Sequence, residues 1–66
     1  MEFQLNGESR QVGGPLTVVS LLERFDLGRR RVAVAINDEV VPRSRFAEVE
    51  IHEGDHVEVI HAVGGG

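Results

Sequence analysis

The sequence predicts an α+β fold in which one helix covers one face of one sheet. Two observations carry this prediction. Short segments typical of strands flank a single segment with helical spacing of apolar residues, and the turn signals Asn6-Gly7 and Asn37-Asp38 separate neighbouring strands. The expected order is strand, strand, helix, strand, short strand, strand, with no repeat or linker between them.

The N-terminal segment is expected to form a hairpin. Residues Met1 to Leu5 alternate apolar and polar side chains, and Asn6-Gly7 is a strong signal for a tight turn. The second strand should run from Glu8 to Val12, because Gly13-Gly14-Pro15 breaks the pattern there.

The helix should begin after Thr17, whose hydroxyl is well placed to cap its N-terminus. Gly28 is expected to end it. The apolar face of this helix repeats at helical spacing and consists of Val18, Leu21, Leu22 and Phe25.

The second half of the chain is expected to add further strands. Residues Val32 to Ile36 are apolar on both faces of the expected strand, which is typical of a strand buried within a sheet and not at its edge. After the Asn37-Asp38 turn, a short strand at Val40-Val41 should stop at Pro42. Residues Glu48 to Ile51 are expected to form another short extended piece.

The last strand should run from His56 to Ala62, after the turn Glu53-Gly54-Asp55. If Val57 and Val59 face the core, a period of two puts three residues on the opposite face. An apolar residue beside a charge suits docking of a protein partner. The residues that we expect on this docking face are Glu58, Ile60 and Ala62.

The composition excludes several classes of function. A chain of 66 residues makes one domain and buries only about 60% of the surface that its unfolded form exposes, which leaves little for a deep active-site pocket. Because it has no Cys, disulfides and thiolate chemistry are excluded. A net charge of −4 without Trp or Tyr argues against nucleic acid as a partner. No apolar run has signal-peptide or membrane-span length, so we expect a soluble, cytoplasmic protein without a membrane partner.

The triplet Gly64-Gly65-Gly66 most needs a functional explanation. Glycines cost backbone entropy to order and add nothing to a core. A tail without Cβ atoms could thread a narrow tunnel and present the Gly66 carboxylate to a bound nucleotide, since four extended residues from Val63 reach roughly 13 Å. The alternative is a frayed terminus without function. Because no nucleophile elbow, phosphate-binding glycine loop or catalytic carboxylate motif is present, the sequence favours a carrier over an enzyme.

Three other groups of polar residues have both a functional and an ordinary interpretation. His52, His56 and His61 do not share a face by their spacing, so surface histidines are favoured over a metal site. The run Arg29 to Arg31 could contact phosphate or an acidic partner, or form a solvated loop after the helix. An acidic group near the tail could steer the chain onto a basic partner or simply aid solubility; it consists of Glu48, Glu50, Glu53, Asp55 and Glu58.

Three stretches resemble one protein family, the ThiS sulfur carriers of thiamin thiazole biosynthesis. They are Leu16 to Leu22, Val34 to Arg43 and Glu53 to Gly66. The resemblance covers the whole chain and implies a ubiquitin-like β-grasp fold, with a mixed sheet of four to five strands and one main helix packed on one face. It divides the chain into a β-grasp domain, residues 1–62, and a flexible glycine tail, residues 63–66.

The resemblance also implies a chemistry for the tail. An E1-like adenylyltransferase would use ATP and magnesium to adenylate the Gly66 carboxylate, and a sulfur donor protein would then convert it to a thiocarboxylate. Thiazole synthase would receive the sulfur, with Val63, Gly64 and Gly65 threaded into the partner's active site. The chain itself would bind no cofactor or metal.

Other functions fit the same ending. The small subunit of molybdopterin synthase is a similar β-grasp domain that ends in Gly-Gly, although the short length and the block Asn37 to Arg43 favour the thiazole carrier. A carrier for tRNA thiolation or protein conjugation would use the same terminal chemistry. The alternative from another class is a β-grasp interaction module whose glycine end is inert.

Overall fold

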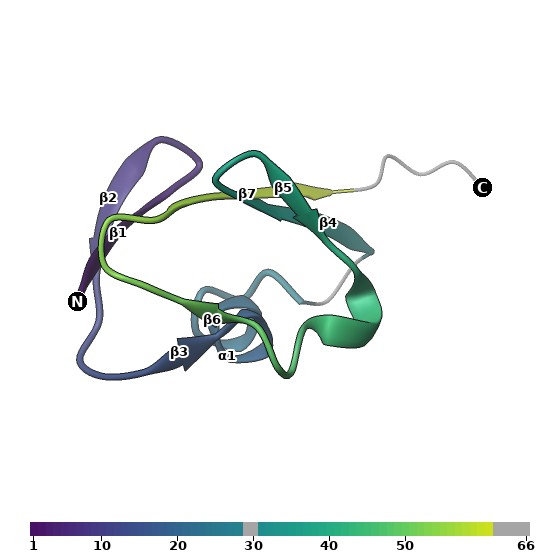
Figure 1. The fold of residues 1–66 in the computed structure, drawn as a ribbon, viewed down its shortest axis with the longest axis horizontal. Coiled ribbons are helices and arrows are strands. Elements are labelled where there is room, and N and C mark those ends of the chain that lie inside the picture. Colours follow the sequence, from purple (N-terminus) through teal and green to yellow (C-terminus); the bar gives the residue numbers. More distant parts are fainter. Residues whose placement is uncertain (29–30, 62–66) are drawn as a thin grey trace.

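The main sheet of the computed structural model, which describes residues 1–28 and 31–61, has the strand order β2-β1-β7-β4-β5 (Figure 1). Strand β1 is antiparallel to β2 and parallel to β7, while β4 is antiparallel to both β7 and β5. The predicted mixed sheet is therefore confirmed. The described elements are β1 (Glu2–Leu5), β2 (Glu8–Gln11), β3 (Leu16–Thr17), α1 (Val18–Arg24), β4 (Val32–Ile36), β5 (Glu39–Val41), a 3₁₀ turn (Arg43–Arg45), β6 (Glu50–Ile51) and β7 (His56–His61).

Both predicted hairpin turns are confirmed. Asn6 and Gly7 have φ angles of 51° and 83°, and Asn37 and Asp38 have φ angles of 51° and 70°. Two-residue turns with positive φ at both positions match the right-handed twist of the flanking strands. The turns therefore fix the registers Leu5↔Glu8 and Ile36↔Glu39.

The helix begins where the sequence predicts. The Thr17 hydroxyl oxygen accepts a hydrogen bond from the Ser20 amide at 3.1 Å and so satisfies one of the free amides of the first turn.

The predicted helix end at Gly28 is wrong. The helix ends at Arg24, and Asp26 takes the left-handed conformation that follows a helix, with φ 58°. The amide of Leu27 donates to the carbonyl of Leu22 at 2.7 Å, and the amide of Asp26 donates to the carbonyl of Glu23 at 3.2 Å. These two bonds form a Schellman motif, in which Asp26 occupies the position that glycine usually takes.

A small second sheet lies outside the sequence-based expectations. Strands β3 and β6 pair antiparallel through Leu16↔Ile51 and Thr17↔Glu50. The predicted extended piece Glu48 to Ile51 is thus confirmed only for its last two residues. Val49 instead bonds through its carbonyl to the amide of Val18, at 3.0 Å, and so holds this segment against the start of α1.

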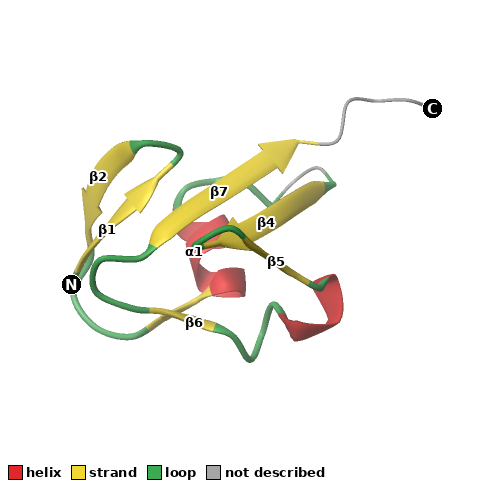
Figure 2. Cartoon of the chain, turned by 45° about the horizontal axis from the view of Figure 1, so that its top comes forward, coloured by secondary structure: helices red, strands yellow, loops and turns green. Residues whose placement is uncertain are grey.

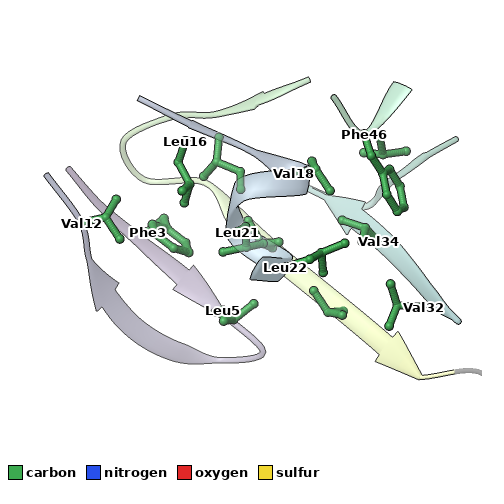
Figure 3. Close-up of a cluster of buried hydrophobic side chains, with 14 residues drawn as sticks. Phe3, Leu5, Val12, Leu16, Val18, Leu21, Leu22, Val32, Val34 and Phe46 are labelled. Atoms are coloured by element: carbon green, nitrogen blue, oxygen red, sulfur yellow. The ribbon is translucent and has the colours of Figure 1, made fainter. Parts of the chain in front are cut away.

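The core lies between α1 and one face of the main sheet (Figures 2 and 3). Its largest fully buried side chains are Phe3, Val18, Leu21, Val34, Ile51 and Val57. The predicted interior position of β4 is confirmed, because this strand pairs with both β7 and β5. Its two faces differ in burial, since Val32 and Val34 are buried whereas Ala33 is exposed. The single helix covers one face of the sheet, and the small alanine side chains lie on the other.

Candidate functional site

Strand β7 leads directly into the residues expected to carry function. Val57 and Val59 are buried, at 1% and 5% exposure, whereas Glu58 and Ile60 are exposed on the outer face of the sheet, the face away from α1. The predicted alternation is therefore confirmed for residues 57–60. The other expected site residues lie outside the described part of the chain: Ala62, Val63, Gly64, Gly65 and Gly66.

The sheet register places further residues beside Ile60 and Glu58. Ala33 of β4 lies opposite Ile60, and Ala35 lies opposite Glu58 on one side and Val40 of β5 on the other. Val40 and Ile60 are the large apolar side chains that the described structure exposes most, at 75% and 62%. We call these five residues the outer-face patch. Sequence analysis missed its β4 and β5 members, because their neighbours depend on a register that no local pattern shows.

Asn6 forms hydrogen bonds to β7, the strand that carries two residues of the outer-face patch. Its amide donates to the carbonyl of Val57 at 2.8 Å. Its side chain accepts from the Val59 amide at 2.9 Å and donates to the Val59 carbonyl at 3.3 Å. Strand β1 ends at Leu5, so Val59 has no backbone partner on that side of β7. The Asn6 side chain takes the place of this backbone partner. Sequence analysis had assigned Asn6 only a turn role.

Part of the predicted acidic group has structural partners. Glu48 pairs with Arg45 at 3.1 Å, and Glu53 accepts a hydrogen bond from the Glu2 amide at 2.9 Å. Asp55 accepts from the His52 amide at 2.8 Å and from the Asn37 side chain at 3.0 Å. These three carboxylates hold loops in place.

The three histidines form no metal site among the described residues, and two residues of the arginine run are not described. His52, His56 and His61 are exposed, and no three potential metal ligands come together among residues 1–28 and 31–61. Arg29 and Arg30 lie outside the described residues, so the basic run stays a prediction. No described helix is long and apolar enough to cross a membrane.

The outer-face patch includes part of β7, the strand that precedes residues 62–66. The core fixes β4 and β7, the outer-face patch presents two exposed apolar side chains, and β7 ends at His61, immediately before residues 62–66. A partner that covers this patch would hold the chain beside the point from which the tail continues.

Comparisons with known proteins agree on one family. The model of the ThiS family matches residues 3–66. The chain is 32% identical to the sulfur carrier protein ThiS of Escherichia coli over 66 residues, covering all of both chains. It is 39% identical to a thiazole synthase of Paramagnetospirillum magneticum, but spans only 20% of that protein. The crystal structure of a thiamine biosynthesis protein (ThiS) from Geobacter metallireducens matches with a TM-score of 0.87, at 33% identity and full coverage of both chains.

Proposed function

The chain belongs to the ThiS family of ubiquitin-like β-grasp sulfur carriers, and on this premise we propose that it carries sulfur on its Gly66 carboxylate. Its function is that of a carrier in thiamin thiazole biosynthesis and not of a catalyst. The observation that carries the proposal is the match to the ThiS family model, which runs through residue 66 and so includes the glycine triplet.

The proposed chemistry begins with activation of a poor electrophile. An E1-like adenylyltransferase brings ATP and magnesium, and the Gly66 carboxylate attacks the α-phosphate with release of pyrophosphate. The acyl adenylate has a good leaving group, so sulfide delivered by a sulfur donor protein displaces AMP and leaves a thiocarboxylate. The carrier's own residues supply position and access, while the partner supplies the reactive groups.

The proposed division of the chain follows from this chemistry. Residues 1–62 form the β-grasp domain that docks, and residues 63–66 form the tail that reacts. Val63, Gly64 and Gly65 thread the partner's active site, which a chain without bulky side chains can enter. Glu58, Ile60 and Ala62 contact the partner's surface, and the exposure of Glu58 and Ile60 supports this assignment.

Thiazole synthase is the proposed acceptor of the sulfur. The support comes from the relative named thiazole synthase, about a fifth of whose length this chain spans at 39% identity. The thiocarboxylate is a soft, anionic nucleophile that suits attack on a carbon electrophile in the acceptor's site. The ThiS match favours this pathway over molybdopterin synthesis and tRNA thiolation.

The test is intact-mass analysis. The chain is incubated with its adenylating enzyme, ATP, magnesium and a sulfur source, and we expect a mass gain of one oxygen-to-sulfur replacement, located at Gly66 by fragmentation. The control omits ATP. An unchanged mass with an enzyme that activates another ThiS protein would overturn the proposal and favour an inert interaction module.

A further inference from the structure

A groove of about 370 Å³ lies beside β5, the edge strand of the main sheet. One wall comes from β5 and the preceding turn, and the other from the segment between Val49 and Asp55. Ile36, Val41 and Val49 give it an apolar lining, and all three belong to or pack against the core. The apolar lining of the groove is therefore held in place by the core, and a partner's side chain could contact it.

The charged lining of this groove is unbalanced. Three carboxylates line it together with one guanidinium, that of Arg45. Arg45 already pairs with Glu48, which is not part of the groove, and both oxygens of Asp55 accept hydrogen bonds from neighbouring loop residues. Glu39 and Glu50 are exposed, and neither side-chain carboxylate forms a hydrogen bond or ion pair with any described residue. Two free carboxylates therefore lie at an apolar groove.

These two properties match one kind of side chain. Lysine and arginine have an apolar stem and a charged head, and they bury the stem along apolar surface while the head stays among polar groups. An anionic group would be repelled by Glu39 and Glu50, and a purely apolar side chain would leave both carboxylates without a partner.

The groove is continuous with the outer-face patch. Val40 belongs to both, because it lines the groove and pairs with Ala35, which also pairs with Glu58 of β7. Strands β7 and β5 are separated by β4 alone, so they lie about 10 Å apart at the usual strand spacing. Glu39 pairs with Ile36 and so lies on the core-facing side of β5, whereas Ile60 lies on the outer face. A partner that covers Ile60 and also reaches Glu39 must therefore extend around the edge strand β5.

We propose that this groove receives an arginine or lysine side chain of the adenylating enzyme while the outer-face patch docks on the same enzyme. The inference rests on the proposed function, since it names a contact made by the partner that activates Gly66. The groove contact fixes how the sheet is rotated on the enzyme, whereas the apolar patch alone would allow several orientations.

The experiment measures the affinity of the adenylating enzyme for three forms of the full chain at several salt concentrations. These are the parent, the double variant Glu39→Gln/Glu50→Gln and the control Glu8→Gln/Glu23→Gln, which removes the same charge from β2 and α1. We expect the groove variant to bind roughly tenfold more weakly at low salt, with a shallower salt dependence, because each exposed charge pair contributes up to about fivefold. The control should stay within about twofold of the parent.

Four other results would overturn the proposed contact between the groove and the adenylating enzyme. Equal binding of the groove variant and the control would overturn the proposal, as would a loss seen only with thiazole synthase. A dimer of the parent chain that the groove variant abolishes would overturn it too, because a second copy would then occupy the groove. If the parent is neither bound nor adenylated, the proposed function fails first and this inference fails with it.

Discussion

Asn6 shows at the scale of one residue how a turn amino acid can serve a distant strand. Its backbone forms the turn of the first hairpin, while its side chain satisfies both backbone groups of Val59, 53 positions away in sequence. A sequence pattern reveals the first role, because the Asn-Gly pair is local. It cannot reveal the second, which depends on β1 and β7 lying side by side.

We predict that Asn6→Ala lowers the free energy of unfolding by about 1–3 kcal/mol, since it leaves the Val59 amide and carbonyl without their partner. Alanine also fits poorly at a φ of 51°. Asn6→Gly removes the same side chain but tolerates this φ, so it should be destabilised less. Urea denaturation measures both. If Asn6→Gly were as stable as the parent, the side-chain bonds would contribute nothing.

Glu58 tests the proposed docking face. It is exposed on β7, opposite Ala35, and forms no ion pair among the described residues. We predict that Glu58→Lys slows association with the adenylating enzyme several-fold and makes its salt dependence shallower, because a charge in the interface mainly changes the association rate. Stopped-flow measurements at several salt concentrations check this. The control is Glu23→Lys on α1, and equal association rates for the two variants would contradict the docking role.

At the scale of elements, helix α1 is short and depends on its neighbours. It has seven residues, fewer than an isolated helix needs to be stable in water. Three of these residues are buried: Val18, Leu21 and Leu22. Its N-terminus is fixed by the Thr17 cap and by the contact of β3 with β6, and its C-terminus by the turn at Asp26.

We predict that Thr17→Ala destabilises the fold by about 1 kcal/mol, the usual effect of losing an N-cap side chain. The hydroxyl now accepts the Ser20 amide at 3.1 Å. Thr17→Ser keeps this oxygen and should keep most of the stability. Thermal or chemical denaturation of both variants gives the comparison. Equal loss in the two variants would assign the effect to the methyl group and not to the cap.

The elements differ in how well the sequence predicts them, for physical reasons. The two hairpins and the helix start follow from residues within a few positions of each other, and all are confirmed. The helix end was misplaced because Asp26 adopts the left-handed conformation before Gly28 is reached. The interior position of β4 is confirmed, but its apolar run does not show which face α1 covers, because alanine is compatible with either face.

At the scale of the whole molecule, the pairing of β1 with β7 brings the first and last strands together in the sheet. The outer-face patch is formed by the pairing of β4 with β7 and β5, so the sequence alone indicated just its β7 members, Glu58 and Ile60. The proposed function therefore has two separate tasks. We propose that the sheet provides a fixed docking surface and that the tail provides the reactive group.

This separation predicts that changes in the tail alter activation without altering stability. Gly65→Val should leave the melting temperature nearly unchanged, because residue 65 lies beyond the last strand. Adenylation should fall severely, since a β-branched side chain does not fit a passage shaped for bare backbone and restricts the φ and ψ angles of the reacting terminus. Deleting Gly66 should be as damaging, because it withdraws the carboxylate by up to roughly 3.5 Å from the nucleotide phosphate.

The experiment compares melting temperature with ATP-pyrophosphate exchange for Gly65→Val, the Gly66 deletion and a matched glycine substitution within the fold. Gly13→Val is the control, because no atom lies within 4 Å of the Cβ that it would add and its φ is not positive. We expect the control to be adenylated like the parent. Parent-like exchange in either tail variant would mean that the tail does not enter the enzyme's active site. Unfolding by Gly65→Val would show that the glycines serve the fold, and the assignment of sulfur carriage to a separate tail would then be wrong.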